Sequence, residues 1–141
     1  MYNKLLLVLV LAISLSACKK NGKKTGCDAN QICTEQFVSL GVAFTDNQGK
    51  PTVVDEYSLK NLRTGKPVTR TSMGAYPDVV AGFIWVANDG IKGEFSSEGD
   101  DVEITAKSKA TGQVKKVVVK VSGGCNCHVA KLSGPDTVKF D

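Results

Sequence analysis

The fold class of this chain is decided by one segment and its continuation: Val102-Glu103-Ile104-Thr105-Ala106-Lys107, then Ala110-Thr111-Gly112-Gln113, then Val117-Val118-Val119-Lys120-Val121. In the first and last parts, apolar side chains occupy every second position. This period of two is typical of a strand with one buried face and one solvated face. Because turn residues separate the two runs, the segment predicts an antiparallel β-hairpin.

Similar short runs occur on both sides of this hairpin, separated by Gly, Pro, Asn and Asp residues that favour turns. They lie at residues 38–44, 52–59, 68–73, 79–87, 129–132 and 137–140. The run 79–87 is long enough for one buried strand or for two with a bend between them. About seven short strands at regular spacing, without a clear amphipathic helix, predict an all-β fold. We expect residues 27–141 to form a single antiparallel β-sandwich.

The first residues have the organisation of an export signal. Lys4 supplies a positive charge, residues 5–15 form an apolar run, and Leu15-Ser16-Ala17-Cys18 follows. The apolar run is too short for a transmembrane helix, which needs about 20 residues. The tetrad resembles the lipobox of bacterial lipoproteins, which implies that Cys18 is diacylated and becomes the first mature residue. Residues 1–17 are therefore expected to be a cleaved signal peptide.

A short polar segment, residues 18–26, follows the signal and contains Lys19, Lys20, Lys23 and Lys24. It has no apolar anchor, which indicates a flexible tether. The lysines either attract the tether to an anionic membrane surface or simply keep it soluble. From Cys27 onward there are 13 basic and 14 acidic residues. This balance gives no reason to expect nucleic acid as a partner.

Four further cysteines occur as one pair before the strands and one pair near their end: Cys27, Cys33, Cys125 and Cys127. In an exported protein such an even set predicts two disulfides. On an extended strand, the Cα atoms of Cys125 and Cys127 would lie about 7 Å apart, which is too far for a mutual disulfide. Each is expected to pair with Cys27 or Cys33, and the sequence leaves the connectivity open.

The cluster Cys125-Asn126-Cys127-His128 also permits a second interpretation. Thiolates and an imidazole suit Zn²⁺ or Cu(I), so Cys125, Cys127 and His128 are candidate ligands of a metal or thiol-redox site. Otherwise no cofactor is expected. Cys127 and His128 cannot act as a nucleophile and its base on a strand, because neighbouring side chains point to opposite faces. No nucleophile–base pair can be recognised in the sequence, which favours a protein that is not an enzyme.

Two other groups of residues are candidates for binding. Tyr76, Phe83 and Trp85 could form an exposed aromatic patch for a sugar or a peptide, or could belong to the core. Residues 98–101, which include Asp100 and Asp101, offer part of a calcium-binding loop. Paired acids beside a turn are more commonly just solvated.

Two stretches carry a family resemblance: Cys18-Lys19-Lys20 after the signal, and residues 123–136, with Cys127-His128-Val129 and Ser133-Gly134-Pro135. They resemble small lipoproteins of Bacteroidota whose β-sandwich is immunoglobulin-like or carboxypeptidase-regulatory-like, that is, transthyretin-like. The resemblance assigns no functional residue beyond Cys18. Surface-exported members usually have acidic residues after the cysteine, where this chain has lysines. The expected function is that of a lipid-anchored, periplasm-facing binding or accessory module whose partner is an envelope protein or glycan.

Overall fold

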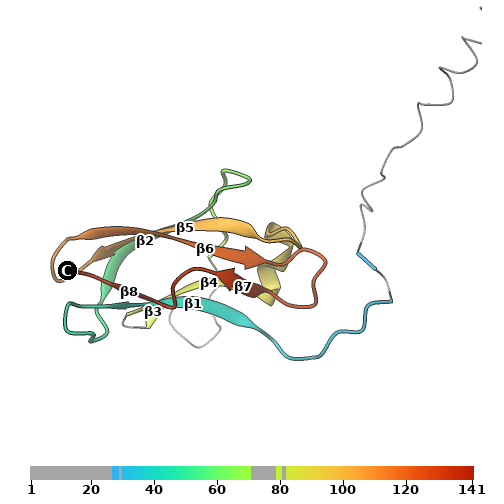
Figure 1. Ribbon diagram of the computed structural model, residues 1–141, viewed down its shortest axis with the longest axis horizontal. Coiled ribbons are helices and arrows are strands. Elements are labelled where there is room, and N and C mark those ends of the chain that lie inside the picture. The colour runs from blue at the N-terminus through green and yellow to red at the C-terminus, as the bar shows by residue number, and fades with distance from the viewer. Residues whose placement is uncertain (1–26, 29, 71–78, 81) are drawn as a thin grey trace, which may run out of the picture.

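The structure is a computed structural model that describes residues 27–28, 30–70, 79–80 and 82–141. The expected signal peptide, the tether and Tyr76 lie outside these residues. Within them the chain forms eight strands and one 3₁₀ helix (Figure 1). The elements in order are β1 (Ser39–Thr45), β2 (Val54–Asn61), β3 (Val79–Val80), β4 (Phe83–Asn88), η1 (Asp89–Glu94), β5 (Asp100–Ser108), β6 (Val114–Ser122), β7 (Ala130–Ser133) and β8 (Thr137–Lys139).

The strands form two four-stranded sheets, β3-β4-β1-β8 and β2-β5-β6-β7, which pack face to face. The all-β prediction and the β-sandwich are thus confirmed. The hairpin that decided the fold class is present as β5 and β6, which pair antiparallel from Asp100↔Val121 to Lys107↔Val114. The run 79–87 contains two strands, with Gly82 at a positive φ of 77° between them.

One pair of strands is parallel, so the expectation of a wholly antiparallel sandwich is wrong at β1 and β8. The chain does not reverse direction between β7 and β8 (Figure 1). It crosses from one sheet to the other through Gly134, Pro135 and Asp136, and the Ala43 N–H donates to the Asp136 carbonyl. Because β8 continues in the direction of β7, it runs beside β1 in the same direction.

The expected strand at residues 68–73 is not formed where the chain is described. Residues 68–70 instead lie along the free edge of β2. The Val68 N–H donates to the Leu59 carbonyl, and the Arg70 guanidinium donates to the Tyr57 carbonyl while stacking on the Tyr57 ring. This covers edge carbonyls that would otherwise be available to another strand. Residues 71–73 lie outside the described part.

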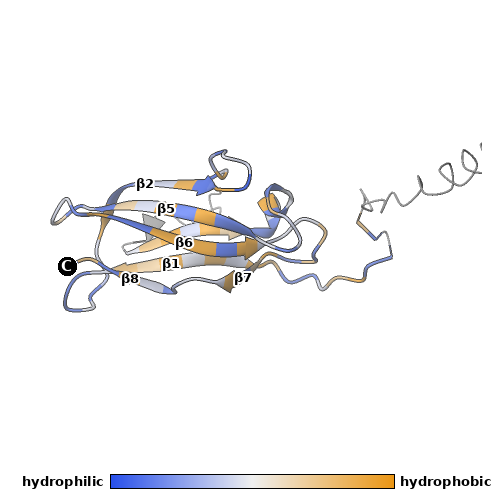
Figure 2. Cartoon of the chain, turned by 45° about the horizontal axis from the view of Figure 1, so that its top comes forward, coloured by the Kyte–Doolittle hydropathy of each residue, from blue (hydrophilic) through white to orange (hydrophobic). Residues whose placement is uncertain are grey.

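The core lies between the two sheets and follows the alternation seen in the sequence. Val102, Ile104 and Ala106 of β5 are fully buried, and the residues between them face outward. Figure 2 shows this alternation of apolar and polar residues along β5 and β6. From the other sheet Val42, Phe44 and Ile84 complete the core; the Phe44 and Phe140 ring centroids lie 5.7 Å apart.

The turn-favouring residues Asn88, Asp89 and Gly90, which follow β4, begin η1. The Asn88 side chain caps it by accepting a hydrogen bond from the Gly90 N–H. No helix among the described residues is long and apolar enough to cross a membrane. The helix matters for the site because its residues face the connection that follows β6.

Candidate functional site

The segment that precedes β1, residues 27–37, is here called the arm. It lies at the end of the sandwich opposite the C terminus (Figure 1). Every arm residue that the structure describes is exposed; the exposed fraction is 96% for Ile32 and 60% for Phe37. Apolar burial therefore does not hold the arm in place.

Two disulfides fasten the arm to the turn after β6: Cys27–Cys125 and Cys33–Cys127, with Cα–Cα distances of 4.9 and 5.3 Å. The predicted disulfides are confirmed, and the structure supplies the connectivity that the sequence left open. Cys125 and Cys127 lie in a turn and not on the extended strand assumed from the sequence. Each still pairs with a cysteine of the arm and not with the other.

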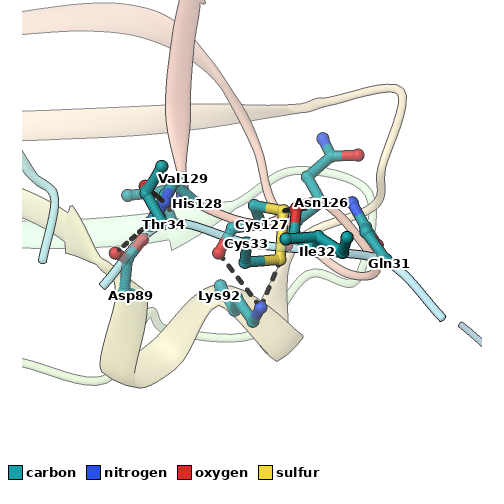
Figure 3. Close-up of a disulfide and its surroundings, with 10 residues drawn as sticks. All are labelled: Gln31, Ile32, Cys33, Thr34, Asp89, Lys92, Asn126, Cys127, His128 and Val129. Atoms are coloured by element: carbon teal, nitrogen blue, oxygen red, sulfur yellow. Dashed lines mark hydrogen bonds and ion pairs between the residues drawn. A yellow bond between two sulfur atoms is a disulfide. The ribbon is translucent and has the colours of Figure 1, made fainter. Parts of the chain in front are cut away.

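The turn that receives the disulfides is itself held firmly. The Ser97 hydroxyl accepts from the Cys125 N–H at 3.2 Å, and the Lys92 ammonium donates to the carbonyls of Asn126 and Cys127 at 3.0 and 3.2 Å (Figure 3). A Cβ on Gly123 would lie 2.4 Å from the Lys92 carbonyl oxygen, so this close approach to η1 requires glycine. The arm is thus fastened to an ordered part of the domain.

A chain of polar side chains forms a second fastening (Figure 3). The carboxylate of Asp89 in η1 lies 2.7 Å from Nδ1 of His128, and Nε2 of His128 lies 2.8 Å from the Thr34 hydroxyl on the arm. Asp89 also accepts hydrogen bonds from the N–H groups of Val38 and Val129, each at 2.8 Å. This one carboxylate connects η1 with the residues just before β1 and β7.

The electrostatics of Asp89 follow from these contacts. Burial raises the pKa of Asp89, but the hydrogen bonds from Val38, His128 and Val129 outweigh it and keep the pKa below its usual range. Asp89 is therefore ionised at neutral pH and fixes the orientation of His128. The sequence showed His128 but not its partners, because Asp89 and Thr34 are far from it along the chain.

Thr34, His128 and Asp89 have the order of groups found in a hydroxyl–imidazole–carboxylate triad. The sequence analysis recognised no nucleophile–base pair, and the structure places the Thr34 hydroxyl beside His128. Acyl transfer also requires oxyanion donors and a substrate cleft beside the hydroxyl. Three cavities formed by described residues have none of these three side chains in their walls. What the contacts do show is a connection between the arm and the sandwich.

The candidate metal ligands are engaged otherwise. The sulfur atoms of Cys125 and Cys127 are in disulfides, and a disulfide has no thiolate to offer Zn²⁺ or Cu(I). Both ring nitrogens of His128 are hydrogen-bonded. In the described part of the chain, no three His, Cys, Asp or Glu side chains gather as a metal site.

The carboxylate of Asp100 is buried near the ends of β2 and η1. The side chain of Asp100 is fully buried and receives Nε and Nη2 of Arg63 at 2.6 and 2.9 Å, together with Asn61 and Ser96. Burial raises the pKa of Asp100, but the hydrogen bonds from Arg63, Asn61 and Ser96 hold it well below its usual range. The expectation of a solvated acid or a calcium ligand is wrong here. Asp100 precedes Val102 by two residues and shares its inward face, a signal that the sequence did contain.

Phe83 and Trp85 form an edge-to-face pair with ring centroids 4.7 Å apart. They alternate with the buried Ile84 and Val86, so they lie on the outer face of their sheet. Both are half-buried, which corrects the expectation that they belong either to an exposed patch or to the core. The Phe83 ring covers Gly41, where a Cβ would lie 2.1 Å from a ring carbon. The two rings border a cavity of about 380 Å³ whose other walls are Ala43, Phe44, Thr45, Pro51 and Gly82.

Comparisons of this chain with protein-family models, with curated proteins and with solved structures find no match. Its function is therefore inferred from its own residues and their geometry. Two regions stand out: the fastened arm and the aromatic cavity.

Proposed function

We propose that this chain is a lipid-anchored, non-catalytic protein of the cell envelope whose β-sandwich serves as a binding or accessory module. The anchor is Cys18, which follows an apolar run and Leu15-Ser16-Ala17. Two or more acyl chains on one cysteine give stable anchoring, because each buried methylene contributes about 0.8 kcal/mol. The lysines of the tether favour a periplasm-facing protein over one displayed on the surface.

The observation that carries this proposal is the fastening of the arm by two disulfides. Disulfides form and persist in oxidising compartments such as the bacterial periplasm. The arm buries no described side chain, so its position depends on these bonds and a few hydrogen bonds. A chain that relies on disulfides at the point where its tether enters the fold is suited to export.

The binding role is supported by the cavity beside Phe83 and Trp85. Its walls are mostly apolar, and aromatic rings supply large contact areas for a sugar ring or an apolar peptide side chain. We therefore propose an envelope glycan or an envelope protein as the ligand.

Lipidation is tested by expressing the full chain and its Cys18→Ser variant in a bacterium that processes lipoproteins. We expect the mature protein to begin at Cys18, to have the mass of a diacylated chain and to partition into detergent. Cys18→Ser should remain in the aqueous phase or keep its signal. Identical partitioning of both proteins, with both disulfides formed, would refute the anchor.

The state of the cysteines is tested by alkylation of the envelope protein, denatured without reductant, followed by mass measurement. We expect no label on Cys27, Cys33, Cys125 or Cys127. Label on two or more of them would favour a metal or thiol-redox protein that uses Cys125, Cys127 and His128.

Binding is tested by co-sedimentation with purified peptidoglycan and by cross-linking to envelope proteins in the native envelope. Phe83→Ala should weaken the interaction by about tenfold or more if the cavity is the site. Val118→Ala is the matched control, because it removes an exposed apolar side chain from the outer face of the other sheet. Equal loss in both variants would exclude the cavity as the binding site.

A further inference from the structure

We infer that the arm end of the sandwich rests on the lipid surface that holds the anchor, with Ile32 inserted among the headgroups. This inference rests on the lipid anchor proposed above and adds a defined orientation of the domain. Among the described residues, the exposed apolar side chains differ in size between the two ends of the molecule.

The larger exposed apolar side chains are found toward the arm end: Ile32 and Phe37 on the arm, Leu62 directly after β2, and Leu132, which lies near Gly99 just before β5. At the opposite end, near the C terminus, Val53 and Val114 are the exposed apolar residues of the described chain. Single exposed apolar residues are common on protein surfaces. Ile32 is unusual because its exposed fraction is 96% although the segment that carries it is fastened covalently.

The arm presents Ile32 at low entropic cost. The residue lies between Cys27 and Cys33, both of which are in disulfides, and the Gln31 side-chain amide lies 3.2 Å from Sγ of Cys127. A residue whose backbone is already restrained loses less conformational freedom when its side chain is buried against a partner.

The tether determines which partner is within reach. Nine residue steps separate Cys18 from Cys27, so the arm lies within about 32 Å of the lipidated residue, at up to about 3.6 Å per step. Lys19, Lys20, Lys23 and Lys24 attract anionic headgroups and draw the tether toward the surface. Asp28 and Glu35 flank Ile32 on the arm and favour a shallow contact at headgroup level over deep insertion. A bilayer surface is thus always present at high effective concentration beside Ile32.

The experiment compares two tryptophan variants of the full chain, Ile32→Trp and Val114→Trp. Each adds one fluorophore to Trp85 at an exposed site, one on the arm and one at the opposite end. The processed lipoproteins are purified and reconstituted into phosphatidylcholine–phosphatidylglycerol vesicles, with and without brominated acyl chains that quench nearby tryptophan. Flotation of the vesicles on a density gradient shows whether each protein is anchored.

We expect both variants to float with the vesicles and only Ile32→Trp to be quenched, by about half of its added emission, with a shift to shorter wavelength. Equal quenching of the two variants, while both float, would overturn the orientation and leave the arm face free for a protein partner. If neither variant floats, the anchor itself is refuted, and the lipid contact is refuted with it. Flotation and quenching thus separate the two failures.

Discussion

The arm and the sandwich that follows it are ordered by different forces. In the sandwich, side chains such as Phe44, Ile104 and Val121 are withdrawn from water completely. In the arm the described residues up to Phe37 are exposed, and the order comes from two disulfides and from hydrogen bonds to His128 and Asp89. Burial is insensitive to redox potential and to single protonation events, whereas disulfides depend on redox potential and carboxylate hydrogen bonds depend on protonation. The two regions should therefore respond to different perturbations.

The largest effect is expected when both disulfides are removed by replacing Cys27, Cys33, Cys125 and Cys127 with serine. Each disulfide alone closes a loop of more than 90 residues. Once one is formed, the other closes a ring of only about ten residues, so removing either pair singly should cost about 3 kcal/mol and removing both about 7 kcal/mol. Urea unfolding of the three variants measures these costs. If the loss of unfolding free energy in the double variant merely equals the sum of the losses in the two single-pair variants, the two disulfides do not share a loop.

The second effect concerns the sandwich alone. Phe44→Ala should lower the free energy of unfolding by about 3–5 kcal/mol, because it leaves a cavity beside Phe140 in the core. Reduction of the disulfides should leave this cost unchanged. Val114→Ala is the exposed control, with an expected change within about 0.5 kcal/mol. A small cost for Phe44→Ala would mean that the disulfides and not the core dominate stability.

The third effect probes Asp100, where the sandwich departs from apolar burial. Asp100→Ala removes the partner of Arg63, Asn61 and Ser96 and should cost about 2–3 kcal/mol in thermal or urea unfolding. Arg63 is more than half exposed and regains water as a partner, so the loss stays below that of a fully buried ion pair. The matched control is Asp101→Ala, the exposed neighbour on the outward face of β5.

The pH dependence of stability tests the ionised carboxylates of both regions, Asp89 beside the arm and Asp100 in the sandwich. Asp89 and Asp100 both have a lowered pKa in the folded protein, so their hydrogen bonds stabilise it fully above the unfolded pKa of about 4. That stability is lost as the pH falls through the lower pKa values that the two carboxyl groups have in the folded protein. The melting temperature should therefore fall steadily below about pH 4, and less steeply in Asp100→Asn. If the melting temperature falls equally steeply with pH in wild type and in Asp100→Asn, Asp100 is excluded as the origin of the pH dependence.

The smallest effect is expected on the arm. Thr34→Val keeps the shape of the side chain but removes the hydroxyl that meets Nε2 of His128, at a cost of about 0.5–1 kcal/mol. Amide hydrogen exchange should speed up on the arm and leave β5 and β6 unchanged. Thr105→Val on β5 is the control. Faster exchange throughout the sandwich would mean that the arm is not a separate unit.

The sequence was sufficient for the sandwich, because strands with one buried face have a visible period of two, as in β5 and β6. It was insufficient for the passage from β7 to β8, since nothing local shows that the chain changes sheets without reversing. Residues 68–70 do not form the strand that the sequence predicted, and the Arg70 side chain donates instead to the Tyr57 carbonyl on the β2 edge. These errors share a cause: they depend on partners distant along the chain.

The same reason limited the candidate site. The even set of cysteines predicted disulfides, but pairing 27 with 125 and 33 with 127 depends on where the arm lies. His128 was visible as the single histidine, whereas Asp89 and Thr34 become its partners only in the folded chain. Asp100 was expected to be a solvated acid or a calcium ligand, although its inward position follows from the pattern of β5. A charged residue in phase with a buried face deserves the same weight as an apolar one.

The attachment of Cys27 to Cys125 also determines how the domain bears tension. Without it, a pull on the preceding chain would act on the Cys33–Cys127 disulfide, and without both disulfides it would act on β1 and peel it from β4 one residue pair at a time. With it, the force passes through a covalent bond to the end of β6, at the turn braced by Lys92 and Ser97. β1 and the arm then carry no load. For the lipid-anchored protein proposed above, mechanical resistance would thus come from a bond that contributes nothing to its core.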